Sequence, residues 1–461
     1  MTPAEGTARS TERSAREGSG GDAREDARGE AAARVPAGRA SGPRAAIGRA
    51  ANAVGEWLRS PLTSLHLVLA VFGLLTVFGL VMVLSASAVQ SFTADGSSYS
   101  VFTRQLMFCG PGLALFWLGL RIPPRRLRAL APVGLAVGVL ALIAVLIVGS
   151  VRNGSRAWFA IGSFSLQPSE AVKVALTLWG AHVLVARRRV MHRWKQALSP
   201  VVPVTALLMT LLVLQPDLGM TVSLGIVLVA LLFYAGAPMR LMLTLTGAAL
   251  GGAIVLALTA DYRLARVTAF LSGNSADPLG AQWQANQALY SLADGGLFGV
   301  GLGQGRAKWD YLPNAHNDFI FAIIGEELGF LGAFAVLALF ATLAYVGIRI
   351  ADRNSDPWLK LVVATSTSWL VAQAAINIGY VVGLLPVTGL QLPLISSGGT
   401  SLVVTMFVFG VLANAARHEP EAVAALQQHG QGTIARLLGL KLPEPYRAPV
   451  SRPAAQRGPL R

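Results

Sequence analysis

Residues 64–85 read SLHLVLAVFGLLTVFGLVMVLS, a run without Asp, Glu, Lys or Arg. A helix of about 20 apolar residues crosses the roughly 30 Å hydrocarbon core of a bilayer. Lipid admits only helices or closed barrels as spanning structures, and this run is far too long for a barrel strand. It therefore predicts a membrane helix. The polar lead of about 60 residues before it does not fit a signal peptide.

Working outward from this run, nine more apolar blocks follow, and the sequence predicts an all-α polytopic membrane protein with about ten transmembrane helices. The composition agrees, because 53% of the 461 residues are hydrophobic and only 13% are charged, half the share of a typical soluble domain. The predicted spans are 64–85, 104–121, 129–149, 168–186, 198–215, 219–237, 241–260, 318–348, 359–384 and 400–416.

The net charge of +15 suggests nucleic-acid binding in a soluble protein, but here the basic residues flank the spans, as the positive-inside rule expects. The clusters fall between even-numbered spans and the next odd ones: Arg121, Arg125, Arg126 and Arg128; Arg187, Arg188, Arg189, Arg193 and Lys195; Arg240; Arg349 and Arg353. We therefore expect both termini in the cytoplasm and no nucleic acid. The single cysteine, Cys109, excludes an internal disulfide and a CxxC metal site.

Three segments complete the predicted organisation. Residues 1–60 are predicted to be a disordered cytoplasmic tail, and 418–461 a mostly disordered cytoplasmic tail, because both lack an apolar period. The ten-helix membrane domain covers 61–417. Its large extracytoplasmic loop, 261–317, lies between helices seven and eight. The loop's aromatic residues favour an ordered segment on the membrane face.

Ionisable residues within a membrane domain are costly, so each indicates a role. The first is Lys173, which follows Gln167-Pro168-Ser169-Glu170 at the start of the fourth span. It either snorkels to the headgroups or faces a cavity with a partner. Upstream stands Asn153-Gly154-Ser155-Arg156-Ala157-Trp158.

Two aspartates stand near the same outer face. Asp217, in Gln215-Pro216-Asp217-Leu218-Gly219, is either a turn residue or part of a site. Asp318 heads the eighth span, where an N-cap is the plain alternative. Lys173, Asp217 and Asp318 together would form an acid–base site facing outward, although the spacing alone does not bring them together. Deeper in the eighth span, Glu326 and Glu327 need partners, and the neighbouring glycines favour a structural role for both.

Two glycine-rich stretches have alternative interpretations. Residues 295–305, GGLFGVGLGQG, meet a dinucleotide-binding pattern, but no strand or βαβ unit surrounds them, so that interpretation fails. Residues 396–401, SSGGTS, open the tenth span. Their backbone N–H groups either hold an anion such as pyrophosphate or cap the helix.

The order of these motifs resembles the SEDS (shape, elongation, division, sporulation) family over residues 64–417, and its FtsW-like branch more than its RodA-like branch. The resemblance rests on NGSRAW with QPSEAVK, QPDLG, WQANQALYSLADGGLFGVGLGQG, LPNAHNDFIFAIIGEELG and GLLPVTGLQLPLISSGGTS. It implies a peptidoglycan glycosyltransferase that polymerises lipid II outside the cytoplasmic membrane at the division septum. The implied partners are a class B, FtsI-like penicillin-binding protein and other divisome proteins.

The resemblance also implies site residues. The family's essential aspartate falls on Asp318, which we expect to act as general base or its support. Expected substrate-binding or site-organising residues are Arg156, Trp158, Glu170, Lys173, Asp217, Gln284, Gln287, His316, Ser396, Ser397, Gly398 and Gly399. No organic cofactor is expected. A divalent cation, Mg²⁺ or Mn²⁺, could share the charge role, with Asp318 as a candidate ligand.

The chain departs from the family pattern at a few positions: Ala157 follows Arg156 where many relatives have arginine, Ser165 stands where some have a basic residue, and Ala288, Asn317 and Ser397 replace serine, threonine and tyrosine. Two other functions stay open. A lipid II flippase would need a polar route through both leaflets, whereas the ionisable residues here gather at the outer face. A divisome scaffold would not need Asp318.

Overall fold

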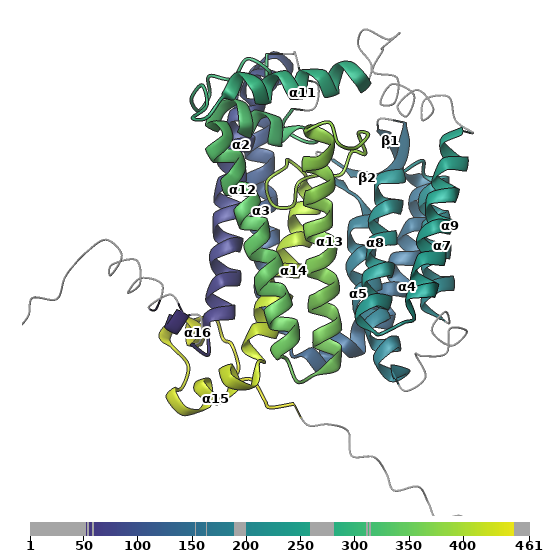
Figure 1. Cartoon of the computed structure of the whole chain (residues 1–461), viewed down its shortest axis with the longest axis vertical. Coiled ribbons are helices and arrows are strands. Elements are labelled where there is room, and N and C mark those ends of the chain that lie inside the picture. The colour runs from purple at the N-terminus through teal and green to yellow at the C-terminus, as the bar shows by residue number, and fades with distance from the viewer. Residues whose placement is uncertain are drawn as a thin grey trace, which may run out of the picture. The chain divides into compact units, whose positions relative to one another are not determined.

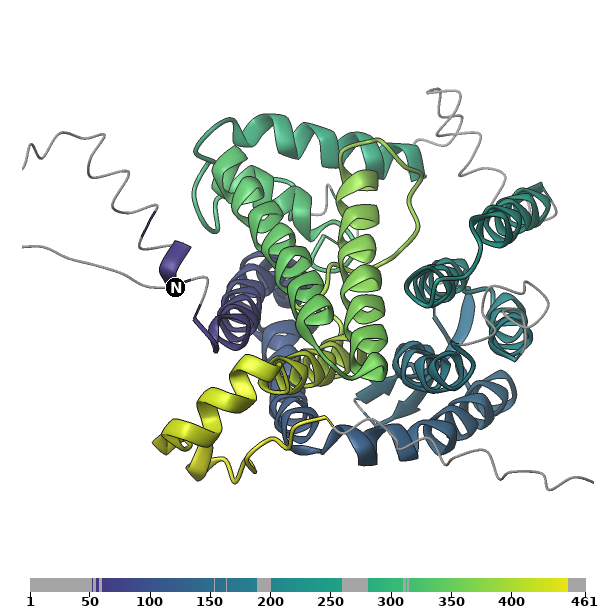
Figure 2. The same cartoon turned by 60° about the horizontal axis from the view of Figure 1, so that its bottom comes forward.

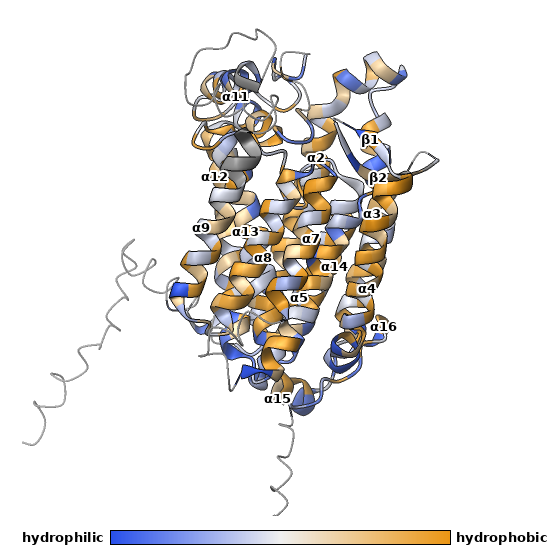
Figure 3. Cartoon of the chain, turned by 90° about the vertical axis from the view of Figure 1, so that its right-hand side faces the viewer, coloured by the Kyte–Doolittle hydropathy of each residue, from blue (hydrophilic) through white to orange (hydrophobic). Residues whose placement is uncertain are grey.

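A computed structural model describes residues 60–446, with gaps at 153, 163, 189–199, 259–280, 310–311 and 313–314, and also residues 52 and 55–57. The expected N-terminal tail over 1–60 lies almost wholly outside these residues, as do 447–461. Figure 1 shows a bundle of long helices, and Figure 3 shows that their middle portions are hydrophobic while polar residues gather at the ends.

Each predicted span coincides with a helix. These are α2 (Thr63–Asp95), α3 (Ser100–Arg121), α4 (Pro124–Val148), α5 (Pro168–Ala186), α7 (Val201–Leu214), α8 (Leu218–Tyr234), α9 (Met239–Leu258), α12 (Ile320–Arg353), α13 (Pro357–Val381) and α14 (Gly399–Arg417). Within the described residues, seven helices are long and apolar enough to cross a membrane, and α7 and α8 are shorter apolar helices. The predicted class, a polytopic helical membrane protein, is confirmed; the number of crossings stays a prediction.

The bundle is centred on α13 and α14. In their most apolar stretches 72% and 78% of the residues are buried, against 17% in α3 and 22% in α4. In Figure 2 α13 lies beside α12, with α7, α8 and α9 on its other side. Close approach at α14 depends on small residues, because a Cβ on Gly119 of α3 would lie 2.8 Å from the carbonyl oxygen of Phe407. Residues on α13 and α14 therefore lie in the most deeply buried part of the bundle.

A small sheet, absent from the all-α prediction, joins α4 to α5. It contains β1 (Ser150–Arg152), β2 (Ser155–Ile161) and β3 (Phe164–Leu166), paired antiparallel in that order (Figure 1). Val151 opposes Arg156, and Phe159 opposes Leu166. The strands are too short to leave a clear alternating pattern in the sequence. The sheet brings β2, which carries Arg156 and Trp158, close to α5.

The glycine-rich part of the loop before α12 completes a broken helix. The backbone of α12 is not helical at Gly329, which has φ +67°. The glycine-rich segment that follows α11 (Ala281–Gly295) lies beside this break. The N–H groups of Val300 and Gly301 donate to the carbonyls of Glu326 and Glu327, and those of Phe330 and Leu331 donate to loop carbonyls. Non-helical backbone at membrane depth requires such internal partners. Residues 261–280, 310–311 and 313–314 of the predicted loop lie outside the described residues.

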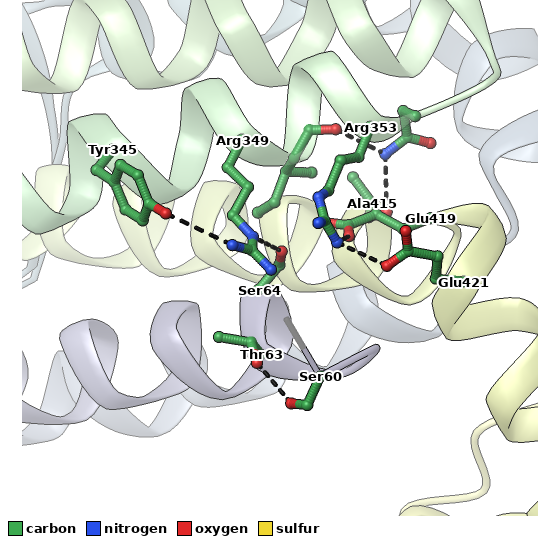
Figure 4. A network of polar contacts seen from close by, with 11 residues as sticks. Ser60, Thr63, Ser64, Tyr345, Arg349, Arg353, Ala415, Glu419 and Glu421 are labelled. Atoms are coloured by element: carbon green, nitrogen blue, oxygen red, sulfur yellow. Dashed lines mark hydrogen bonds and ion pairs between the residues drawn. The ribbon is translucent and has the colours of Figure 1, made fainter. Parts of the chain in front are cut away.

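The C-terminal segment differs from the expected disorder. It contains α15 (Pro420–His429) and α16 (Thr433–Leu437) and is described to residue 446. Ala422, Val423 and Leu426 are buried. Their i, i+1, i+4 spacing is that of one helix face, but the pattern is too short and alanine-rich to predict a packed helix from the sequence. Figure 4 shows Arg353 of α12 beside Glu419 and Glu421 at the start of α15, while Arg349 donates to Ser64.

Candidate functional site

The site begins at the first turn of α5. Pro168 occupies the first helical position, and Glu170 and Lys173 follow three residues apart on one face. The Lys173 Nζ lies 3.0 Å from Glu170 Oε2 and 4.6 Å from the ring centre of Trp369 on α13. Both charged side chains are buried. Of the two interpretations of Lys173, the structure favours the paired lysine over the snorkelling one.

Gln167, just before α5, ties this pair to two other motifs. Its Nε2 donates to Asp217 Oδ2 at 2.9 Å, and its backbone N–H donates to Thr400 Oγ1 at 3.1 Å. Asp217 also caps α8, because its Oδ1 accepts from the N–H of Met220 at 3.1 Å. Burial raises the pKa of Asp217, Glu170 raises it further, and Lys173 lowers it. Asp217 is thus both a cap and a neighbour of the Lys173 pair.

Two side chains of α13 hold the backbone of Asp318 in place. Its carbonyl accepts from Asn377 Nδ2 at 3.0 Å and from the Tyr380 hydroxyl at 2.7 Å, both on α13. One interpretation of the sequence is that Asp318 is simply the N-cap of α12. That interpretation is wrong, because the N-cap residue is Phe319. The Asp318 side chain is half-buried and faces Gly389, where an added Cβ would lie 4.0 Å from Oδ2. The backbone of Asp318 is therefore fixed by α13, while the residue as a whole is only half-buried.

A run of amides, which we call the amide relay, links the lysine to the Asp318 segment. Lys173 Nζ donates to Gln373 Oε1 at 3.1 Å, and Gln373 Nε2 donates to the carbonyl of Gln391 at 2.8 Å. Gln391 Nε2 then donates to Asn317 Oδ1 at 3.3 Å. Sequence reasoning missed Gln373 and Gln391. The available signal was Gln373 itself, a polar amide inside the apolar span 359–384.

The SSGG stretch packs against the same segment. The N–H of Ser397 donates to the carbonyl of His316 at 3.0 Å, and the N–H of Gly398 donates to Gln105 Oε1 at 3.2 Å. Ser396 Oγ accepts from the N–H of Leu392. A Cβ on Gly398 would displace the Gln391 side-chain amide, and one on Gly399 would collide with the Phe108 ring. The N–H groups of Ser397 and Gly398 therefore already have acceptors within the fold.

Other expected site residues lie apart from the relay. Arg156 on β2 is exposed and Trp158 is half-buried, with the Arg152 guanidinium 5.8 Å from its ring centre. The neighbouring Ser155 hydroxyl donates to the carbonyl of Gln215, which ties the hairpin to the turn before Asp217. The structure therefore places this hairpin beside the site, with Arg156 on its exposed side.

Gln284 and Gln287 are half-buried on α11, and no described contact joins them to Asp318. His316 is half-buried, and burial lowers its pKa. Its Nδ1 is buried without a hydrogen-bond partner among the described residues. Within that same part of the chain, no group of three His, Cys, Asp or Glu side chains is arranged to hold a metal ion.

A second buried charge cluster explains Glu326 and Glu327. Lys308 Nζ lies 2.9 Å from Glu327 Oε1, and the Ser85 hydroxyl donates to Glu327 Oε2. Glu326 accepts from the backbone N–H groups of Arg306 and Ala307. The structural role expected for both glutamates agrees with this geometry, because each carboxylate is satisfied inside the fold.

A cavity of about 340 Å³ lies away from these residues. It is formed by the last turn of α5, the end of α8, the end of α12 and the start of α13, and is lined by Leu184, Arg188, Tyr234, Asp352, Lys360 and Leu361 among others. Leu184 is eleven residues along α5 from Lys173, or about 16 Å at 1.5 Å per residue. The candidate site residues therefore lie at one end of the bundle, and this cavity lies at the other end.

Together these features define a multi-pass membrane protein with a site of lysine, carboxylate and amide side chains at one end of its helices. The family described as cell cycle proteins FtsW, RodA and SpoVE matches residues 65–421. The chain therefore belongs to the FtsW/RodA/SpoVE family, the SEDS family that its motifs resemble.

Individual relatives agree. The chain is 52% identical over 397 residues to the probable peptidoglycan glycosyltransferase FtsW of Mycobacterium tuberculosis, covering 86% of this chain and 76% of the relative. It is 39% identical to stage V sporulation protein E of Bacillus subtilis, and the match covers 77% of this chain and 98% of that relative. Its fold is similar to Thermus thermophilus rod shape determining protein RodA, with a TM-score of 0.58, 29% identity, and 79% and 99% covered. A chain of a peptidoglycan synthase complex has a TM-score of 0.60 at 28% identity, with 74% and 96% covered.

Proposed function

We propose that this chain is a peptidoglycan glycosyltransferase that polymerises lipid II into glycan strands during septal wall synthesis. The observation that carries the proposal is the amide relay, which runs through Gln373 and joins Lys173 of the QPSEAVK motif and Gln391 of the GLLPVTGLQLPLISSGGTS motif to the segment bearing Asp318. Relatives named as FtsW glycosyltransferases at up to 52% identity support the activity.

Asp318 acts as the general base that takes a proton from the acceptor sugar hydroxyl, or as its close electrostatic support. Its backbone is clamped by Asn377 and Tyr380, so the carboxylate is presented from a fixed point. Lys173 is buried and paired, so we assign it to positioning the site rather than touching pyrophosphate. Exposed Arg156 is the better candidate for the leaving phosphate. Transfer from an α-linked donor to a β-linked polymer needs a single displacement only.

Asp318 is also the candidate ligand for a divalent cation. The described residues offer no group of three metal-ligating side chains, so the fit requires the substrate to complete the shell. Mg²⁺ binds in that way, through one or two carboxylates together with substrate phosphates and water. A bound cation would neutralise charge that develops on the leaving pyrophosphate.

The proposed function also implies a partner protein and a cellular location. We expect a class B, FtsI-like penicillin-binding protein to cross-link the strands, together with other divisome proteins at the septum. A similar fold occurs in a peptidoglycan synthase complex described as coordinating polymerization and crosslinking. The arginine clusters support cytoplasmic termini and an outward-facing site.

The test is strand formation from labelled lipid II by purified protein, with and without its cognate penicillin-binding protein and with Mg²⁺, Mn²⁺ or chelator. Polymer from wild type and none from folded Asp318→Asn is expected. No polymer under any condition would contradict the proposal and favour a flippase or a scaffold. Equal polymer from both proteins would keep the activity and remove Asp318 as its base.

A further inference from the structure

The segment 433–446 folds back onto the turn between α3 and α4. The indole Nε1 of Trp117 donates to the carbonyl of Leu438 at 2.9 Å. Arg417 donates to the carbonyl of Lys441 at 2.8 Å, and Arg125 lies 4.0 Å from Glu444. Leu440 is buried in the core of the bundle. The segment is thus fixed to the ends of membrane helices.

Despite this docking, the segment leaves large apolar side chains exposed. Leu437 is 84% exposed, Leu442 49%, Tyr446 41% and Leu438 39%. Exposed leucines are expected on the lipid-facing sides of the spans, but this segment lies beyond the end of α14. Clustered apolar side chains outside the spans mark a surface that contacts something apolar.

The depth of the segment points to the bilayer itself. Trp117 is four residues before the end of α3, or about 6 Å at 1.5 Å per residue. The Arg121 guanidinium lies 4.7 Å from the Trp117 ring centre. Tryptophan and arginine at the end of a span lie typically at headgroup level. Leu438, bonded to Trp117, is therefore held at the membrane interface.

Cations surround the same surface. The exposed basic side chains of the segment and of the turn that it covers are Arg121, Arg125, Arg126, Arg436 and Lys441, and the acidic one is Glu444. Apolar side chains flanked by Arg and Lys are the composition of an interfacial anchor, which inserts apolar groups between acyl chains and pairs its cations with anionic headgroups.

We infer that residues 433–446 form an interfacial anchor that inserts Leu437 and Leu442 into the anionic leaflet beside the end of α3. The occupant is the lipid headgroup region, because the exposed leucines and the five cations lie together at the depth set by Trp117. The anchor would hold the end of α14 and the helix α15 against the membrane surface.

The test uses the single cysteine of the chain. Cys109 is buried, so a Cys109→Ala background allows one engineered thiol to carry an environment-sensitive fluorophore. Leu437→Cys and Leu442→Cys are compared with Gln428→Cys on the exposed side of α15, all in full-length protein in nanodiscs. Nitroxide lipids labelled near the headgroup serve as the quencher.

We expect several-fold stronger quenching at 437 and 442 than at 428 in discs that contain phosphatidylglycerol. Quenching at 437 should fall in phosphatidylcholine discs and in an Arg436→Gln, Lys441→Gln variant. Quenching at 437 no greater than at 428 would overturn the anchor and leave the leucines to a protein partner. Equal quenching in both lipids and in the variant would overturn the anionic selectivity. Size-exclusion profiles that match wild type show that the variants are folded.

Discussion

Two buried clusters in this protein each contain one lysine and two carboxylates. In the first, Lys173 pairs with Glu170, and Asp217 lies beside them through Gln167. In the second, Lys308 pairs with Glu327, and Glu326 lies next to it in α12. By composition the two are equivalent.

Their connections differ. The second cluster is closed, because its carboxylates accept from Lys308, a serine hydroxyl and backbone N–H groups of the glycine loop that completes α12. The first cluster is open, because side-chain amides lead from Lys173 to Asn317, beside the half-buried Asp318. We therefore expect the first cluster, whose hydrogen bonds lead to the half-buried Asp318 segment, to belong to the functional site and the closed cluster to be structural.

The largest expected effect separates the two clusters by activity. Asp318→Asn should lower glycan polymerisation by at least about 100-fold, the lower bound for loss of a general base. The thermal unfolding temperature in detergent should stay within a few degrees of wild type, because the Asp318 backbone bonds to Asn377 and Tyr380 remain. Matched loss of activity and of stability would place Asp318 with the closed cluster instead.

The closed cluster should show the reverse behaviour. Glu327→Gln leaves Lys308 buried with a weakened partner, and breaking a buried pair costs about 3–5 kcal/mol. The thermal unfolding temperature should fall strongly, while the polymerisation rate per folded molecule changes little. Glu327→Leu with Lys308→Met serves as control, because removing both charges should recover much of the loss. A folded Glu327→Gln protein without activity would show that the second cluster is also functional.

The helices and the residues of the first cluster could be predicted from sequence, because apolar length and intramembrane charge are local signals. The connections could not. Gln373 and Gln391 join the cluster only through tertiary contacts, as does the bond from Gln167 to Asp217. The break at Gly329 is hidden for the same reason, since a loop from earlier in the chain supplies its hydrogen bonds.

A further buried carboxylate, Glu419, lies outside both clusters at the other end of the bundle and extends the comparison. Burial raises the pKa of Glu419 to about 7, although the nearby charges of Arg353 and Arg349 lower it (Figure 4). A raised pKa means that the folded state favours the protonated acid. The stabilising contribution is therefore full below about pH 4.5 and is lost as the pH rises to about 7.

The loss amounts to at most about 3 kcal/mol, from 1.36 kcal/mol for each unit of pKa. We expect the unfolding temperature to fall between pH 5 and pH 7.5 in wild type and to depend less on pH in Glu419→Gln. Glu421→Gln is the matched control, since Glu421 is exposed and pairs with the same Arg353. An unchanged pH profile in Glu419→Gln would show that this carboxylate is ionised throughout.

The smallest expected effect tests the relay itself. Gln373→Leu removes both hydrogen bonds, and loss of a buried bond to a charged group costs about 1.5–3 kcal/mol. Since the relay positions the Asp318 segment, we expect polymerisation to fall by about tenfold, or 1.4 kcal/mol in the barrier, with most of the change in kcat. Ser368→Ala on the same helix is the control, because Ser368 bonds to Tyr234 away from the relay.

Gln373→Glu distinguishes positioning from charge compensation. Glutamate still accepts from Lys173 Nζ but cannot donate to the carbonyl of Gln391 when ionised. If Gln373 serves only to satisfy the lysine, this variant should keep wild-type activity while Gln373→Leu loses it. If the relay holds the Asp318 segment in place, both variants should lose activity, because both break the bond at Gln391. Loss in both variants would show that the open cluster positions the Asp318 segment, whereas retained activity in both would make it a second structural pair like Lys308 and Glu327.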